Sequence, residues 1–254
     1  MRPDVVLEHG RIRVEVAAAP LQVTVRRDGR RLVGPIEPRV RDGEIGDHFV
    51  QWTEGVIAAE TLGDPLVLTA ALDGDAARLA VRLADGTAGV LEVTLPERDR
   101  VLIELTCAAG SAPAAERPVR RLGFTWPGHP EQRTTGMGAR HGMHVDQAGR
   151  SVALGADRRY TGPDCPADML DQGGIPQGDY APLPWALSSR GWAAWLETDG
   201  PGALFALGDE IEISAREAAG PLRLHLFCAR TPAARLRELL RAARSLPALL
   251  PEWA

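Results

Sequence analysis

Residues 180–196 read Tyr-Ala-Pro-Leu-Pro-Trp-Ala-Leu-Ser-Ser-Arg-Gly-Trp-Ala-Ala-Trp-Leu and carry the strongest local signal in the chain. Two apolar runs, 185–187 and 192–196, flank the polar stretch 188–191, which ends in glycine. Two apolar strands around a short loop that contains glycine are typical of a β-hairpin. The two prolines before the first run indicate a strand start or a sheet edge, because proline cannot donate a hydrogen bond within a central strand. The stretch therefore predicts antiparallel β structure.

The same alternation of strands and turns extends over most of the chain. Residues 11–16 alternate charged and apolar side chains with a period of two, as in a strand with one buried face. Asp28 and Gly29 lie between two such runs and predict a two-residue hairpin turn of type I′. Regular short strands separated by Gly, Pro and Asp turns are typical of an antiparallel β-sandwich. We expect its further strands at Val5–Leu7, Arg11–Ala17, Leu21–Arg27, Arg30–Val33, Phe49–Ala59, Leu66–Leu72, Arg78–Leu83, Val90–Leu95, Val101–Cys107, Val119–Trp126, Gly202–Leu207, Glu210–Arg216 and Leu222–Cys228.

Two stretches depart from this pattern. Residues 127–180 are rich in Gly, Pro and Asp and have few apolar runs, which predicts long loops, and long loops within a compact domain are usually functional. From Thr231 the apolar period becomes that of a helix, with Thr231 as its N-cap and Pro232 in its first turn, and Ser-Leu-Pro at 245–247 ends it. The chain is therefore expected to be mainly β with one short C-terminal helix. The apolar residues at helical spacing are Leu236, Leu239, Leu240 and Ala243.

The composition is that of a soluble globular protein. Of the 254 residues, 44% are hydrophobic and 25% are charged, and no apolar run is long enough for a transmembrane helix or a secretion signal. This predicts a cytoplasmic protein. The formal net charge is -5 and the arginines are scattered among acids, so we expect no nucleic-acid and no membrane partner, whereas a neutral ligand such as a sugar fits this charge pattern.

The cysteines and histidines do not form a known cofactor motif. Cys107, Cys165 and Cys228 lie far apart without a Cys-x-x-Cys pair, so neither a zinc site nor a disulfide framework is predicted. His141 and His144 are three residues apart, but no Cys or Glu ligand lies near them in the sequence. We therefore expect no metal and no other cofactor.

Three separated motifs occur in an order that a known family shares. Gly-Met-Gly-Ala-Arg at 136–140, followed by Asp-Gln-Ala-Gly at 146–149, resembles the Gly-x-Gly-Glu-Arg and Asp-x-x-Gly signature of the amino-terminal domain of family 31 glycoside hydrolases. This family includes α-glucosidases, α-xylosidases and sulfoquinovosidases. The hairpin at 180–196 resembles the family's Pro-hydrophobe-Ser-Ser-Arg-Gly-Tyr-Gly segment, and 231–253 resembles the helix and Pro-x-Trp linker that lead into its catalytic barrel.

The resemblance implies a β-sandwich of the galactose-mutarotase-like type over residues 1–230 and a helix and linker over residues 231–254, leading to a (β/α)8 barrel that this chain lacks. In the family the catalytic aspartates lie in that barrel. This chain is therefore expected to be the non-catalytic amino-terminal domain of a retaining α-glycosidase, inactive alone and docked on the barrel. Ala139 departs from the family pattern, which commonly has Glu there, and this removes a carboxylate partner for Arg140.

The resemblance also implies a substrate-binding loop. A loop of the family's sandwich reaches over the barrel mouth, and Asp157 occupies the position at which that loop offers an aspartate to sugar hydroxyls. Arg158, Arg159 and Tyr160 follow it, and an aromatic ring next to charged hydrogen-bonding groups can cover a sugar face. We expect these four residues to contact the α-linked glycoside substrate of the whole enzyme, whose sugar and linkage the sequence does not specify. A surface loop that closes on itself is the alternative.

Three other functions stay open. A stand-alone carbohydrate-binding sandwich would work without a barrel. An aldose 1-epimerase would need His and Glu side chains in one cleft, a suggestion that rests on the shared fold type. An oligomerisation module would expose a large apolar patch. The six tryptophans could form a sugar-stacking platform, although we expect Trp185 and Trp195 to be buried because they lie at strand positions.

Overall fold

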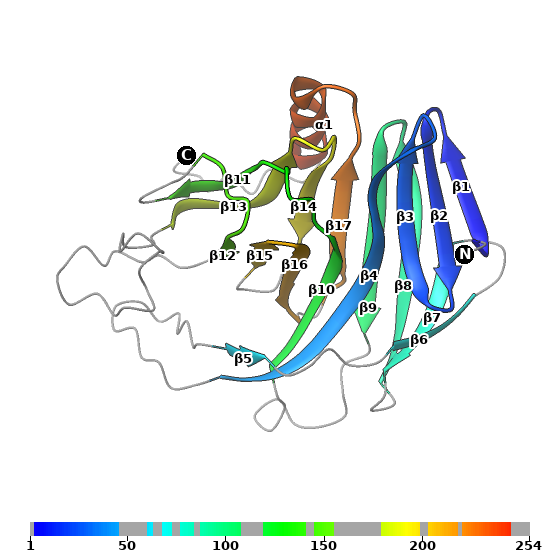
Figure 1. The fold of residues 1–254 in the computed structure, drawn as a ribbon. Helices are drawn as coiled ribbons and strands as arrows, with labels where there is room; N and C mark the ends of the chain where they lie inside the picture. The colour runs from blue at the N-terminus through cyan, green and yellow to red at the C-terminus, as the bar shows by residue number, and fades with distance from the viewer. Residues whose placement is uncertain are drawn as a thin grey trace.

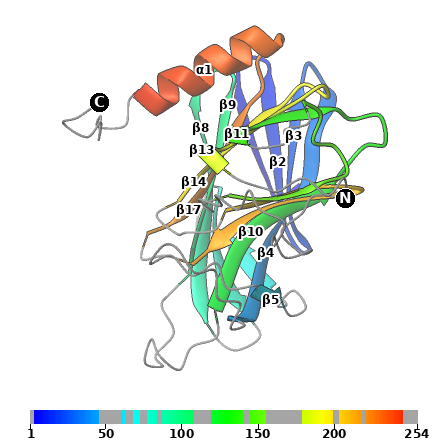
Figure 2. The same cartoon turned by 90° about the vertical axis from the view of Figure 1, so that its left-hand side faces the viewer.

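Two antiparallel β-sheets pack face to face, and one helix lies at one end of the sandwich (Figure 1 and Figure 2). Within the described residues, the prediction of a mainly β, antiparallel sandwich with one short helix is confirmed. No described helix is long and apolar enough to cross a membrane. The computed structural model describes residues 3–45, 60–62, 68–72, 77–83, 87–107, 119–140, 145–154, 179–198, 203–217 and 220–244.

The first sheet contains nine described strands, namely β1 (Val5–His9), β2 (Ile12–Ala18), β3 (Leu21–Arg27), β4 (Arg30–Ile45), β5 (Glu60–Leu62), β10 (Val119–Pro127), β12 (Ser151–Ala153), β15 (Leu204–Leu207) and β16 (Glu210–Arg216). They lie in the order β1-β2-β3-β4-β10-β16-β15-β12, and β5 pairs with β4. The second sheet contains eight, namely β6 (Leu68–Leu72), β7 (Arg78–Leu83), β8 (Ala88–Glu97), β9 (Arg100–Cys107), β11 (Thr134–Arg140), β13 (Asp179–Ser188), β14 (Ala193–Glu197) and β17 (Leu222–Phe227). Their order is β11-β13-β14-β17-β9-β8-β7-β6, and the helix α1 spans Pro232–Arg244.

The alternating residues of the strands place the core between the sheets. In β2 the side chains of Ile12, Val14 and Val16 face inward and are at most 1% exposed. The turn that follows β3 has the predicted geometry, since Asp28 (φ 49°) and Gly29 (φ 78°) both adopt the positive φ of a type I′ turn. Local sequence therefore sets both the buried face and the hairpin register in this part of the chain.

Aromatic side chains fill the centre of the core. The rings of Trp126, from β10, and Trp192, which precedes β14, meet edge to face with their centroids 5.5 Å apart. This arrangement suits the quadrupoles of two aromatic rings. Because the two residues come from different sheets, the contact joins the two layers. Phe124 and Phe205 are fully buried in the same cluster.

Helix α1 covers part of the outer face of the second sheet, over β14 and β17. Leu239 and Ala242 face that sheet and are buried, whereas Leu236 and Leu240 are 39% and 47% exposed. The apolar residues at helical spacing therefore divide between two sides of the helix. At its first turn the predicted N-cap is confirmed, because the hydroxyl of Thr231 accepts a hydrogen bond from the N–H of Ala234 at 3.2 Å.

Two sequence predictions were wrong in part. Trp185 and Trp195 are half-buried, because they lie on the outer face of the second sheet and α1 covers them only partly. The stretch 127–180 contains the strands β11 and β12 as well as loops. Glycine has low strand propensity, so the Gly-Met-Gly sequence of β11 gives no local strand signal, and β11 forms by pairing with β13.

We expect Gly123→Ala to destabilise the sandwich. Gly123 lies on β10 between β4 and β16, and a Cβ there would be 2.4 Å from the Cβ of Ser214 and 2.8 Å from the carbonyl oxygen of Ile213. Relieving such overlap requires backbone movement, so the free energy of unfolding should fall by about 1–3 kcal/mol in a denaturant titration. Gly208→Ala is the matched control, because its Cβ would meet only Glu210 O at 3.8 Å. Equal stability of the two variants would contradict the close packing of β10 against β16.

Candidate functional site

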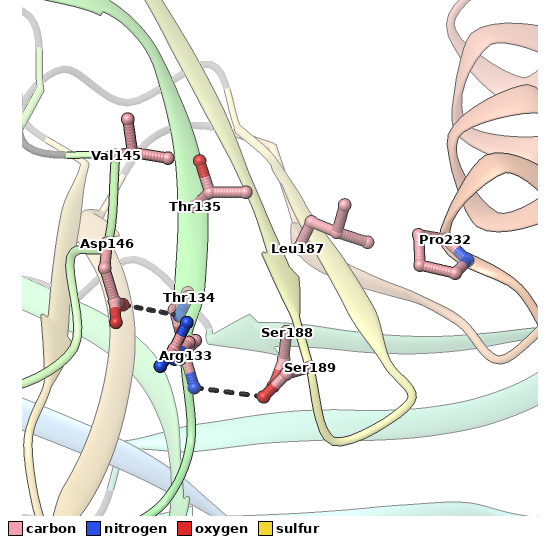
Figure 3. Close-up of a pocket in the computed structure, with 9 residues that line it drawn as sticks. All are labelled: Arg133, Thr134, Thr135, Val145, Asp146, Leu187, Ser188, Ser189 and Pro232. Atoms are coloured by element: carbon pink, nitrogen blue, oxygen red, sulfur yellow. Dashed lines mark hydrogen bonds between the residues drawn. The ribbon is translucent and has the colours of Figure 1, made fainter.

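The three motifs that resemble the glycosidase signature meet at one corner of the sandwich. The start of β11, the loop 145–150 and the turn between β13 and β14 surround a pocket of about 380 Å³, and Pro232 at the start of α1 completes it (Figure 3). These segments are distant in sequence, so only the fold brings them together. The lining residues are Arg133, Thr134, Thr135, Val145, Asp146, Leu187, Ser188, Ser189 and Pro232.

The Gly-Met-Gly motif of β11 lies opposite an irregularity in β13, because Gly136 pairs with Ala186 and Gly138 pairs with Pro182. Gly136, Met137 and Gly138 have φ values of 129°, 61° and 84°, and the pairing with β13 shifts register between the two glycines. A Cβ on Gly136 would be 2.4 Å from the carbonyl oxygen of Trp185, so glycine is required there. Met137 accepts an unusual conformation because its side chain is fully buried in the core. The motif therefore has a structural role.

Asp146 attaches the loop 145–150 to β11. Its Oδ1 accepts hydrogen bonds from the N–H of Thr134 at 2.9 Å and of Ala148 at 3.1 Å (Figure 3). The N–H of Gln147 donates to the carbonyl oxygen of Thr134 at 2.6 Å, and that of Gly149 donates to Leu207 O at 2.7 Å. The Asp-x-x-Gly motif thus connects β11 to β15.

The Ser-Ser-Arg-Gly turn is held in the same way. The hydroxyl of Ser189 accepts a hydrogen bond from the N–H of Arg133 at 3.0 Å, and the N–H of Ser189 donates to Arg133 O at 2.9 Å. Ser188 Oγ accepts from the N–H of Arg190 at 3.1 Å. These hydroxyls and the Asp146 carboxylate thus bind backbone groups, while Val145 and Leu187 offer apolar surface to the pocket. The pocket is therefore suited to an apolar group.

Exposed apolar side chains gather around this corner. Among the described residues five large apolar side chains are exposed, and only Val6 lies elsewhere, on β1. Val145 lines the pocket and is 77% exposed, and Leu183, four residues before Leu187 on β13, is 51% exposed. Leu236 and Leu240 follow Pro232 along α1. We call Val145, Leu183, Leu187, Pro232, Leu236 and Leu240 the α1–β13 surface.

The two exposed leucines of α1 face the β13 side. Glu238 lies near Asp99, which is on the turn between β8 and β9. Leu236 and Leu240 are each two residues from Glu238, about 200° around the helix axis, so they face the opposite flank. Because α1 lies over β14 and β17, between β13 and β9 in the sheet order, that flank is the β13 side.

A second polar cluster lies on the outer face of the second sheet. His225 on β17 is 2% exposed, and its ring stacks on that of Trp195 with centroids 4.6 Å apart. Its Nδ1 is 2.8 Å from Nη2 of Arg100 and its Nε2 is 2.7 Å from the carboxylate of Glu197. Since arginine only donates, Nδ1 accepts and Nε2–H donates to Glu197. Burial lowers the pKa of His225, so the neutral ring is favoured.

This His–Glu pair does not provide an open acid and base. Both nitrogens of His225 are engaged within the protein, and the ring is covered. Of the other two histidines in the described ranges, His9 on β1 is exposed, and His129 accepts a hydrogen bond from the N–H of Glu131. Neither has a carboxylate partner among the described residues. The described residues therefore give no support to an aldose epimerase site.

The described residues also form no metal centre. Within the described ranges no group of three or more His, Cys, Asp or Glu side chains could hold a metal ion. Cys228 is buried, and burial raises the pKa of its thiol to about 12, so it stays protonated and unreactive. The candidate substrate-binding residues lie outside the described residues, as do several other residues of interest. These are Asp157, Arg158, Arg159 and Tyr160, together with His141, His144, Cys165, Trp52 and Trp253.

The sequence shows the motifs, but it does not predict the pocket and the exposed apolar surface that they form together. It assigns no role to Leu183, which lies between two prolines, or to Val145, which lies between His144 and Asp146, because an isolated apolar residue has no period that would mark it. The sequence shows the apolar residues of α1 as a helical pattern. Only the packing of the helix on the sheet decides that Leu239 is buried and Leu240 is exposed.

We expect Asp146→Ala to destabilise this corner, because two backbone N–H groups lose their acceptor. The free energy of unfolding should fall by about 2 kcal/mol, measured by denaturant titration. Asp146→Asn keeps the Oδ1 acceptor and should lose less than half as much. If Asp146→Ala were as stable as the native chain, the carboxylate would be free for another role, such as binding a ligand.

No protein-family model matches this sequence, and no curated protein matches it in a sequence comparison. Among solved structures, a GH31 family sulfoquinovosidase from E. rectale in complex with an aza-sugar inhibitor matches with a TM-score of 0.60 and 15% identity, over 90% of this chain and 34% of that one. An α-N-acetylgalactosaminidase from Bifidobacterium bifidum matches with a TM-score of 0.45 and 12% identity, over 95% and 38% of the two chains. A cycloalternan-degrading enzyme from Trueperella pyogenes matches with a TM-score of 0.40 and 16% identity, over 99% and 37%.

This chain spans about a third of the length of each of these three solved structures. Of the three, only the sulfoquinovosidase has a TM-score above 0.5, and at 15% identity the match concerns the fold. Nearly the whole described sandwich therefore has the fold of one part of a GH31 family enzyme.

Proposed function

We propose that this chain is the amino-terminal, galactose-mutarotase-like sandwich domain of a retaining family 31 α-glycosidase. The observation that carries the proposal is the meeting of three separated family-like motifs at one corner of the fold, around one pocket. The fold similarity to part of a GH31 family enzyme supports it. In this proposal the sandwich comprises residues 1–230, and residues 231–254 lead to a catalytic barrel that supplies both catalytic aspartates.

The α1–β13 surface is proposed as the place where the sandwich docks on the barrel. It presents exposed leucine and valine side chains next to an apolar pocket, and water-exposed apolar side chains that gather in one region mark an interaction site. Arg133 at the pocket and Arg237 on α1 are exposed, so the surface has positive charge at its edge. A partner surface with an apolar centre and carboxylates around it would complement it.

The proposal gives the sandwich a second task at the active site of the whole enzyme. The loop that includes Asp157, Arg158, Arg159 and Tyr160 would contact the α-linked glycoside, with the aspartate accepting hydrogen bonds from sugar hydroxyls. The barrel would determine most of the sugar specificity. The whole enzyme would act on its substrate in the cytoplasm and use no cofactor.

The first test is an activity assay on the protein that contains the neighbouring coding sequence. We expect hydrolysis of an α-linked p-nitrophenyl glycoside by the long protein and none by this chain alone. Asp157→Ala in the long protein should lower kcat/KM about tenfold or more, as the loss of a hydrogen bond to a charged group implies. Asp171→Ala, in the same stretch of sequence, is the control. A coding sequence without a barrel would instead favour a stand-alone carbohydrate-binding sandwich.

The docking surface has its own test. Leu236→Glu places a charge at the proposed contact, and Val6→Glu is the matched control, since both side chains are 39% exposed. In the isolated chain each variant should change the free energy of unfolding by less than about 0.5 kcal/mol, because neither residue is in the core. In the long protein, Leu236→Glu alone should lower activity and the midpoint of thermal unfolding. Equal effects of the two variants would place the contact elsewhere.

A further inference from the structure

Helix α1 rests on the sandwich through a small contact. Leu239 and Ala242 pack on Ala193 and Phe227, and this buried set is separate from the main core. Trp185, Leu187 and Trp195 pack around it and are only partly buried. Arg235 adds polar links, with its guanidinium donating to carbonyl oxygens next to the helix. Few buried apolar groups hold the helix, so a charge change on one of its flanks can alter its seating.

One flank of α1 brings Glu238 into an acidic environment. Asp99 and Glu97, at the turn between β8 and β9, oppose its negative charge. Arg27 at the end of β3 and Arg241 on α1 itself favour it. The Oε2 atom of Glu238 is buried, and no residue in the described part of the chain forms a hydrogen bond with it. A carboxylate oxygen without a partner is costly to bury while it carries charge.

Of the two arginines that favour the charge of Glu238, Arg27 is already paired with Asp99 and Arg241 lies in solvent. Arg27 donates to the carboxylate of Asp99 at 2.9 Å and also to the carbonyl oxygen of Cys228. Arg241 is exposed. The Cys228 thiol, which also lies near Glu238, is neutral and brings no compensating positive charge. An ionised Glu238 would therefore add negative charge to a site where the half-buried guanidinium of Arg27 already pairs with Asp99.

Burial raises the pKa of Glu238 to about 7, and the negative charges of Asp99 and Glu97 add to this effect. In an unfolded or detached helix the carboxyl would titrate near its ordinary value of 4.5. Near neutral pH the seated helix therefore holds a proton that the detached helix releases.

We propose that Glu238 acts as a proton-operated latch, whose neutral carboxyl seats α1 against the β8–β9 turn and whose ionised form loosens the helix and the α1–β13 surface that it carries. The latch itself is a property of this chain. Its regulatory meaning, control of docking by pH, rests on the proposed function of that surface.

The direction follows from proton linkage. The folded pKa lies above the unfolded one, so the stabilisation is complete below about pH 4.5, declines as the pH rises toward 7, and is lost above it. His225 acts in the opposite sense, because its folded pKa is lowered, and its contribution is lost as the pH falls below 6.5. A substitution at Glu238 is needed to separate the two.

Amide hydrogen exchange of the isolated native chain tests the latch. Exchange of the α1 segment, corrected for intrinsic rates, is compared with that of β9 at pH 5.5 and pH 8.5. We expect protection of α1 relative to β9 to fall roughly tenfold at the higher pH. Glu238→Gln keeps the shape of the neutral carboxyl, so protection of its α1 should change less than twofold and exceed that of the native chain at pH 8.5.

Glu131→Gln, at an exposed position outside the helix, is the control and should follow the native chain. A carboxyl NMR titration of the native chain, which requires no variant, should give a pKa for Glu238 near 7. Constant α1 protection in the native chain, the same pH response in Glu238→Gln, or a pKa near 4.5 would each overturn the latch. None of these measurements involves a barrel or a sugar. If the Leu236→Glu assay contradicts the docking proposal, the proposal of the latch is unaffected. If the exchange and NMR measurements contradict the latch, the docking proposal is likewise unaffected.

Discussion

The buried guanidinium of Arg235 links helix α1 to the turn between β13 and β14. The side chain is 3% exposed and donates hydrogen bonds to Ala229 O at 3.0 Å and Ser188 O at 3.5 Å. A planar guanidinium can reach two such acceptors at fixed angles, which a lysine cannot do. Because the apolar contact beneath α1 is small, this link positions Pro232 at the pocket, the exposed leucines beside β13, and Glu238 against the β8–β9 turn.

The corner built on this link separates structural and recognition roles among its residues. The polar side chains that make the motifs recognisable, such as Asp146 and Ser189, bind backbone groups and hold the loops together. The side chains left to meet a partner are apolar, among them Val145 and Leu187. Such a corner is suited to contact with another protein surface, and sugar contacts in the proposed enzyme are assigned to a different loop.

Two titratable groups on the second sheet and its helix respond to pH in opposite directions. His225 is held neutral between Arg100 and Glu197, and protonation would place a second positive charge beside Arg100. Glu238 is favoured in its neutral form by burial and by neighbouring carboxylates. Acid therefore destabilises the sheet through His225, whereas it stabilises the packing of α1 on the sheet through Glu238. Helix α1 can thus respond to pH separately from the sandwich.

The sequence by itself determined the strands with alternating side chains, the type I′ turn at Asp28 and Gly29, and the N-cap of α1, because each depends on neighbours only a few residues apart. It also showed the three motifs and their order. The tertiary structure alone decided that the glycine-rich β11 is a strand, that Trp185 and Trp195 lie on an outer face, and which leucines of α1 are exposed. It decided too that the motifs surround one pocket. Those outcomes depend on pairing and packing between segments far apart in the chain, and a local pattern contains no information on which face a distant element will cover.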